Sequence, residues 1–195
     1  MRKMTKVGIG LMALGVGVWA AWNAWMRTRT MNPVEIPVTI AVGASTASNF
    51  ELNYDGLYLI EIAAQGADLS ELETIKAEWN LRSDGQEVQR GSTDEAHSAP
   101  GGGQGGARVI GEFHGRSGHR YELRVKFTAD APTLQKANPG LRVAVSGLAQ
   151  ENLQAASVLV FSTMFICELF GVILVGVGAW GRAAAGQRDP SHKSE

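Results

Sequence analysis

Glu168 carries the clearest chemical implication in this sequence. It is the only charged residue between Ala155 and Trp180, a run of 26 residues. A helix of that length rises about 39 Å, enough to cross a bilayer with some tilt, and Glu168 lies near its middle. A carboxylate at that depth is costly unless it is paired, protonated or hydrated. The residue therefore predicts contact with a partner group, with a tolerated protonated carboxyl and ion or proton conduction as alternatives.

The residues around Glu168 predict how this run packs. Small and apolar residues recur on one face of it, and we expect partner contact at Glu168, Gly171, Gly178 and Ser162. The whole face is Ser157, Phe161, Met164, Glu168, Gly171, Val175 and Gly178.

The first apolar run along the chain, Val7–Met26, carries small residues at alternating spacings of three and four, which places them on one helix-packing stripe. The stripe is Gly10, Ala13, Gly17, Ala20 and Ala24. We expect it to receive Phe161 and Met164; the alternative is that Gly and Ala are simply frequent in membrane helices.

No other residues form a catalytic or metal-binding pattern. His97, His114 and His119 lie in polar loops without a cluster of Cys or acidic ligands beside them, so we expect no metal site. The single cysteine, Cys167, is interpreted as a small apolar filler. No nucleophile-elbow sequence is present. We therefore expect no catalytic residue, no cofactor and no enzymatic activity.

A glycine-rich segment matches the dinucleotide-binding spacing only formally. Gly101, Gly103 and Gly106 have that spacing, but a strand pattern follows them where a helix N-terminus is required. We interpret residues 92–106 as a flexible polar loop.

Aromatic residues at strand alternation offer one further possibility, a sugar-binding face. The residues are Tyr58, Trp79, Phe113, Tyr121 and Phe127. Alternating aromatic residues more often form a core, and we favour that interpretation.

The run Val7–Met26 is expected to anchor the N-terminal end of the chain in a membrane. It is long enough to span a bilayer, and Trp19, Trp22 and Trp25 form an aromatic cluster at one end, as at a membrane interface. We interpret it as a signal anchor; a cleaved signal peptide is the alternative.

The positions of cations predict the orientation of the two runs. Arg2, Lys3 and Lys6 precede the first run, and three further cations follow the second, whereas only Arg27 and Arg29 flank the middle segment closely. Positive flanks stay in the cytoplasm. Residues 1–6 and 181–195 are thus expected to be cytoplasmic, and the middle segment extracellular or, in a bacterium, periplasmic at the inner membrane.

The middle segment, residues 33–150, predicts one antiparallel β-sandwich, jelly-roll or Ig-like. Asp84-Gly85 indicates a tight hairpin turn. A short helix is expected at 68–76, and 149–155 is expected to lead as helix into the second apolar run. The expected strands are Val34–Val42, Asn49–Asn53, Leu57–Ala64, the two arms of the hairpin 76–91, Arg108–Phe113, Arg120–Phe127 and Leu141–Val145.

Two segments carry a resemblance to known modules. Gly56–Ile62 has the pattern G-x-Tyr-x-Ile-x-Ile, and Gly118–Val125 has G-x-x-Tyr-x-Leu-x-Val. The pair resembles strands of jelly-roll and Golgi-dynamics-like sandwich modules. That resemblance implies binding of sugars or protein partners, and no matched binding residue is carried over.

Length and charge limit the function classes. The chain has 195 residues and a net charge of −1, and residues 27–150 hold 12 Lys/Arg against 15 Asp/Glu, which excludes a basic nucleic-acid-binding surface. We expect a non-enzymatic accessory subunit that docks through its membrane helices on other membrane subunits or a second copy, within the lipid bilayer. The alternatives are a tethered module that binds glycan or peptide, and a transient assembly or quality-control factor.

Overall fold

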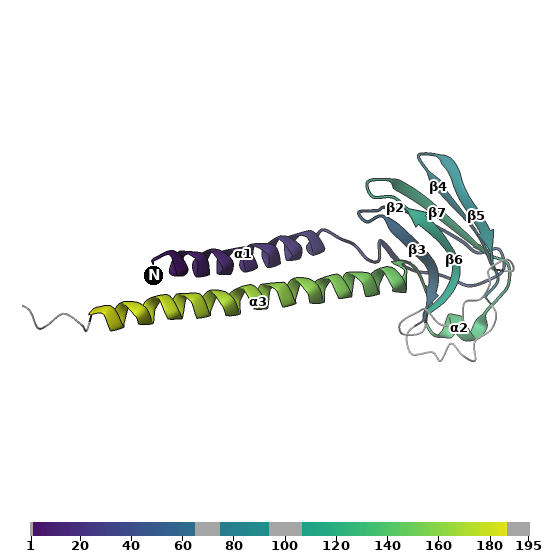
Figure 1. Cartoon of the computed structure of the whole chain (residues 1–195). Helices are drawn as coiled ribbons and strands as arrows, with labels where there is room; N and C mark the ends of the chain where they lie inside the picture. Colours follow the sequence, from purple (N-terminus) through teal and green to yellow (C-terminus); the bar gives the residue numbers. More distant parts are fainter. Residues whose placement is uncertain (1, 65–74, 94–106, 187–195) are drawn as a thin grey trace, which may run out of the picture. The chain divides into compact units, whose positions relative to one another are not determined.

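A computed structural model describes residues 2–64, 75–93 and 107–186. The chain divides into two compact units, the helical unit of residues 1–27 and 152–195 and the two-sheet domain of residues 28–151. We describe each unit by itself (Figure 1).

The helical unit is built from two long helices. Helix α1 runs from Arg2 to Arg27, and α3 runs from Gly147 to Gly186, its first residues belonging to the domain. Neither contains a proline, so nothing interrupts its backbone hydrogen bonds. Both are long and apolar enough to cross a membrane, and few of their residues are buried. The two apolar runs seen in the sequence are therefore two long helices near the ends of the chain.

The domain consists of two four-stranded antiparallel sheets. One has the order β1-β8-β3-β6 and the other the order β2-β7-β4-β5. Among the described strands, only β4 and β5 are both consecutive in the chain and neighbours in a sheet, so each other pair of successive strands lies in different sheets. The strands are β1 Val34–Pro37, β2 Ser45–Glu51, β3 Gly56–Ala63, β4 Ala77–Ser83, β5 Gln86–Ser92, β6 Ala107–Gly115, β7 Arg120–Phe127 and β8 Gly140–Val145, with a short helix α2 at Pro132–Lys136.

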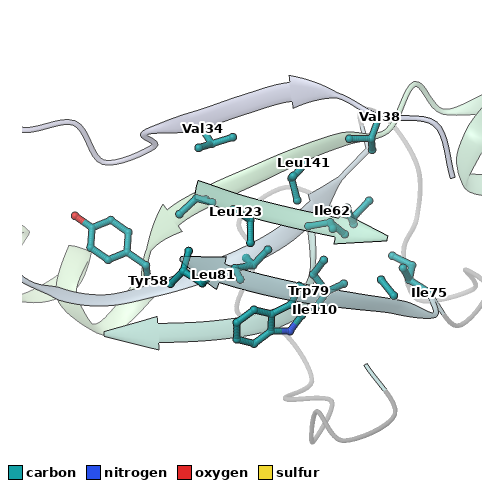
Figure 2. Packing of buried hydrophobic residues seen from close by; sticks show 14 of the residues in the cluster. Val34, Val38, Tyr58, Ile62, Ile75, Trp79, Leu81, Ile110, Leu123 and Leu141 are labelled. Carbon is teal, nitrogen blue, oxygen red and sulfur yellow. The ribbon is translucent and has the colours of Figure 1, made fainter. Parts of the chain in front are cut away.

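The inner faces of both sheets share one hydrophobic core. In β3, Tyr58, Ile60 and Ile62 point inward, as their alternation predicts, and all three are fully buried. Leu81 and Leu123 meet them from the other sheet (Figure 2). This arrangement confirms the expected antiparallel, two-sheet character of the middle segment.

The turn between β4 and β5 confirms the Asp-Gly signal. Asp84 and Gly85 have φ values of 51° and 80°, and both central positions of a type I′ turn need such values. At the edge of the domain where the two sheets are in contact, the Trp79 indole lies so close to Gly91 and Gly111 that a Cβ on either glycine would overlap it.

Two expected strands have different bounds in the structure. The expected strand Val34–Val42 is paired as strand only as far as Pro37. Val38 N still donates to Pro139 O at 3.0 Å, but Pro139 has no N–H to return that bond, so the ladder stops there; Val38 and Ile40 are nevertheless buried. The expected strand Asn49–Asn53 instead begins at Ser45 and ends at Glu51. Most of the short helix expected at 68–76 lies outside the described residues.

The chain enters and leaves the domain at the same end. Strands β1 and β8 are antiparallel neighbours, with Val34 opposite Val143. The entering segment is held by Asn53, whose side chain bonds the backbone of Thr28 and Thr30, and Met31 O accepts a hydrogen bond from Val145 N at 2.9 Å. The points at which α1 and α3 join the domain therefore lie close together.

Candidate functional site

Glu168 is a half-buried residue of α3 whose atom Oε1 is buried without a hydrogen-bond partner among the described residues. Two hydroxyl groups of α3 bond their own helix: Ser157 donates to Leu153 O and Thr163 to Leu159 O, each at 2.9 Å. The Asn23 side chain on α1 likewise donates to Trp19 O at 2.9 Å. None of these polar groups satisfies Glu168.

Glu168 borders a groove that is otherwise apolar. The groove has a volume of about 540 Å³, and Glu168 is its only lining residue from α3. All of the others belong to α1: Ile9, Met12, Ala13, Val16, Gly17 and Ala20. The arrangement offers one carboxylate beside a shallow, small-residue surface, which suits an incoming helix with a hydrogen-bond donor.

Helices α1 and α3 are antiparallel and make contact through glycines. A Cβ on Gly8 would lie 2.7 Å from the carbonyl oxygen of Gly171, and a Cβ on Gly15 would lie 3.1 Å from Cys167 Cβ. Further along, Trp22 Nε1 donates to Ser157 Oγ at 3.3 Å. The two backbones are therefore too close for any larger side chain at Gly8. A Cβ at Gly15 would be tight, and its neighbours would have to shift slightly.

The structure corrects the expected packing of the small-residue stripe. Around Gly10 and Gly17 there is open space where a Cβ would lie, and the three alanines of the stripe, Ala13, Ala20 and Ala24, are exposed. The stripe does not receive Phe161, which is 49% exposed, or Met164, which lies against Gly15. The expected contact with α3 is therefore wrong, because the helix turns a different set of glycines toward its neighbour.

The face predicted on α3 is partly the one that meets α1. Gly171 and Val175 lie against Gly8, while Gly178 is buried and Ser162 is exposed. The glycines Gly8 and Gly15 were missed in the sequence. Their spacing of seven, continued by Trp22, is a helix-face signal that could have identified them.

Two buried polar side chains of the domain, those of Glu61 and Tyr58, have hydrogen-bond partners. Glu61 is 2% exposed, and its Oε2 accepts from Arg142 Nε at 2.9 Å and Nη2 at 2.6 Å. Tyr58 donates its hydroxyl to Tyr54 O at 3.0 Å. Burial, followed by the neighbouring Tyr54, Asp55 and Tyr121, raises the pKa of Tyr58 to about 12.

The other candidate residues lie apart from this site. The five alternating aromatic residues are buried, at most 6% exposed, which confirms that they belong to the core. His114 and His119 are exposed, and no group of three metal-ligating side chains lies together in the described part of the chain. His97 and the three glycines Gly101, Gly103 and Gly106 lie outside the described residues.

The solvent face of the sheet that contains β2 carries two shallow hollows. One, of about 580 Å³, lies beside the ion pair between Arg120 and Glu51, at 3.2 Å; the other, of about 950 Å³, includes Arg124, which pairs with Glu122 at 2.6 Å. Glu51, Arg120 and Arg124 are exposed, and all four of these side chains are already in ion pairs, so these four are not left free for a ligand.

Comparison with known proteins identifies no family. No family model matches the chain, and no curated protein sequence matches it. A crystal structure of a protein from Sulfurospirillum deleyianum is similar at 9% identity and a TM-score of 0.48, covering 60% of this chain and 98% of that chain. No functional conclusion follows from that likeness.

Proposed function

We propose that this protein is a non-enzymatic accessory subunit of a larger membrane complex. Its two helices anchor it in the bilayer and dock on a partner, while its domain is presented outside the cytoplasm. The observation that carries the proposal is that Glu168 Oε1, beside the groove on α1, has no hydrogen-bond partner in the described part of the chain.

The exposure of the apolar helices supports a membrane location. A core helix of a soluble protein is mostly buried, whereas Phe165, Phe170 and Ile173 of α3 are 65%, 56% and 49% exposed. Apolar surface of this extent is stable only against lipid or another protein. The close packing of Gly8 against Gly171 supports an anchor that is retained rather than a cleaved signal peptide.

The connections of the domain support the expected topology. Because α1 and α3 join the domain at one end, both can cross the same membrane with the domain on one side. The cations that precede α1 and follow α3 favour a cytoplasmic location for both termini. The strand orders β1-β8-β3-β6 and β2-β7-β4-β5 support a jelly roll rather than an Ig-like sandwich.

The chemistry of Glu168 favours a protein partner over lipid alone. Leaving a buried polar atom unpaired costs about 1–3 kcal/mol, and more when the atom belongs to a charged group. A partner helix that places a donor such as Lys, Arg, Asn or Gln beside Glu168 removes that cost. Small residues at Ala13, Gly17 and Ala20 allow its backbone to approach.

The alternative of a ligand-binding module has less support. The aromatic residues that would form a sugar platform are buried, and Arg120 and Arg124 beside the hollows are paired with Glu51 and Glu122. A transient assembly factor would bind its partner through the same groove beside Glu168. It differs from an accessory subunit only in how long that contact lasts.

Two glycines of α1 give a matched test of this docking. Gly17 lines the groove and Gly10 does not, yet around both there is open space. Leucine at either position therefore leaves the α1–α3 contact intact. We expect Gly17→Leu and Glu168→Leu to detach the protein from its complex and Gly10→Leu to leave it attached.

The measurement is the size and composition of the complex that contains the full-length protein, after gentle detergent extraction from its own membranes. Membrane insertion and the melting temperature of the domain serve as controls. The proposal is wrong if the complex survives both Gly17→Leu and Glu168→Leu, or if all three variants release it equally.

A further inference from the structure

Strand β2 forms an open edge of its sheet. It pairs with β7 on one side and with no other strand in the described part of the chain. Phe127 N bonds Ala44 O, and Leu52 N bonds His119 O, so the even-numbered residues between them direct their backbone groups toward β7. The backbone groups of the odd-numbered residues consequently point away from the sheet. These residues are Ser45, Ala47, Asn49 and Glu51, and all four are exposed.

The other three edges carry features that oppose pairing. Strand β1 has only four residues and ends in Pro37. Strand β5 has an irregular register and exposes the charged side chains Glu87 and Arg90. Strand β6 is bulged where it meets β3, and its Glu112 O accepts a hydrogen bond from Gln89 Nε2. Short strands, proline, charges and bulges are the usual means by which edges are kept from pairing.

Strand β2 has none of these protections. It pairs over seven residues without a bulge and contains no proline and no lysine. Its one charged residue, Glu51, is at its end and bonds Arg120. An exposed, regular and nearly uncharged edge of this length invites pairing with another strand.

We propose that the β2 edge binds an extended segment of a partner protein, which adds a strand to the sheet. Backbone hydrogen bonds to Ala47 and Asn49 supply the contact. A segment of alternating apolar and polar residues fits, because Thr46, Ser48 and Phe50 lie on the core side of β2 and the odd-numbered residues on the solvent side.

The direction of β2 argues against a second copy as the occupant, a point that rests on the proposed membrane anchoring. The strand runs toward Asn53, which holds the segment that enters from α1. Antiparallel pairing of two β2 edges across a two-fold axis would place the two attachment ends at opposite ends of the joined sheet. Two copies anchored in one membrane need both ends on the same side.

The test uses a dye-labelled peptide that copies Arg120–Phe127, the strand already matched to β2 on its other side. In the native pair, the backbone groups of Leu123 and Val125 point toward β2. A peptide on the open edge lies on the opposite side of β2, so with its apolar side chains on the same face of the sheet the backbone groups of its Glu122 and Arg124 copies would bond β2. We expect the peptide to bind the full-length protein in detergent, measured by fluorescence anisotropy. Methylating the backbone nitrogens of the Glu122 and Arg124 copies should weaken binding at least about tenfold, and methylating those of the Leu123 and Val125 copies should change it little.

A pair of protein variants provides the second arm. Ala47→Pro removes one outward-facing N–H while sparing the β7 ladder, and Ala47→Ser keeps it. We expect the former to weaken binding and the latter to leave it unchanged, with domain melting as the folding control. Absence of binding at millimolar peptide, or equal effects of the two methylation patterns, would overturn the proposal.

The remaining outcomes separate this inference from the proposed function. Self-association of the full-length protein that Ala47→Pro abolishes would overturn the choice of occupant. Glu168→Leu should not affect peptide binding, so a failure of helix docking leaves the result at the β2 edge intact.

Discussion

Two acidic residues show how differently the two units treat a carboxylate. Glu61 is almost fully buried in the domain, and Arg142 satisfies it with two hydrogen bonds from the neighbouring strand. Glu168 Oε1 is buried in the helical unit and has no partner in the described residues. Buried polar atoms in proteins are normally hydrogen-bonded. The lack of a partner for Glu168 Oε1 among the residues that the structure describes is therefore consistent with a hydrogen-bond donor from another protein.

Tyr58 gives a residue-scale prediction about pH. Its pKa is raised to about 12, chiefly by burial, so the folded state keeps the proton between pH 10 and pH 12 while the unfolded state loses it. The free energy of unfolding should therefore be fully maintained below pH about 10 and then fall by at most about 2.7 kcal/mol as the pH rises to about 12. Chemical denaturation of the domain at a series of pH values measures this loss.

The control for this prediction is Tyr58→Phe. It removes the hydrogen bond to Tyr54 O, which costs about 1 kcal/mol at neutral pH, but it also removes the ionisable group. Its stability should fall less steeply at alkaline pH than that of the natural protein. Parallel losses in the two proteins would show that Tyr58 is not responsible.

At the scale of elements, the pairing of α1 with α3 depends on which face of α1 carries the contact. Gly8 and Gly15 pack against α3, whereas no atom of the described residues lies close to the position of a Cβ on Gly10 or Gly17 of the predicted stripe. The groove uses three residues of that stripe, Ala13, Gly17 and Ala20. Its role as a docking surface for a further helix stays a prediction.

Gly15 makes the helix pairing testable with the natural cysteine. A Cβ at Gly15 would lie 3.1 Å from Cys167 Cβ, slightly closer than in a normal disulfide, while around Gly17 there is open space. We expect Gly15→Cys to form an intramolecular disulfide with Cys167 under mild oxidation and Gly17→Cys to keep two free thiols. Mass spectrometry after maleimide labelling counts the thiols. Two free thiols in Gly15→Cys, or a disulfide in Gly17→Cys, would contradict the described pairing.

Much of the element order could be predicted from the sequence, and the failures have physical causes. Leu57–Ala64 and Arg120–Phe127 were identifiable because alternating apolar residues on a half-buried strand have a period of two. The start of β2 was missed because Ser45–Ser48 are small and lack large apolar side chains, and their pairing depends on β7 rather than on their own pattern. The Glu61–Arg142 pair joins residues 81 positions apart, so no local signal could reveal it.

At the scale of the whole molecule, connectivity and composition favour the same architecture. The domain receives α1 and releases α3 at neighbouring strands, and both helices expose apolar side chains over most of their length. The face of α1 that packs against α3 could not be predicted, since Gly and Ala occupy several faces of that helix and the contact itself selects Gly8 and Gly15.

The central claim is that both helices cross one membrane and hold the domain outside the cytoplasm. Single cysteines test it in a Cys167→Ser background, with Val42→Cys in the domain, where Val42 is 65% exposed, and Met4→Cys near the N-terminus, where Met4 is 50% exposed. Ser191→Cys serves near the C-terminus. A membrane-impermeant maleimide added to spheroplasts should label Val42→Cys at once and the two terminal cysteines only after lysis. Labelling of either terminal cysteine before lysis, or protection of Val42→Cys until lysis, would contradict the account.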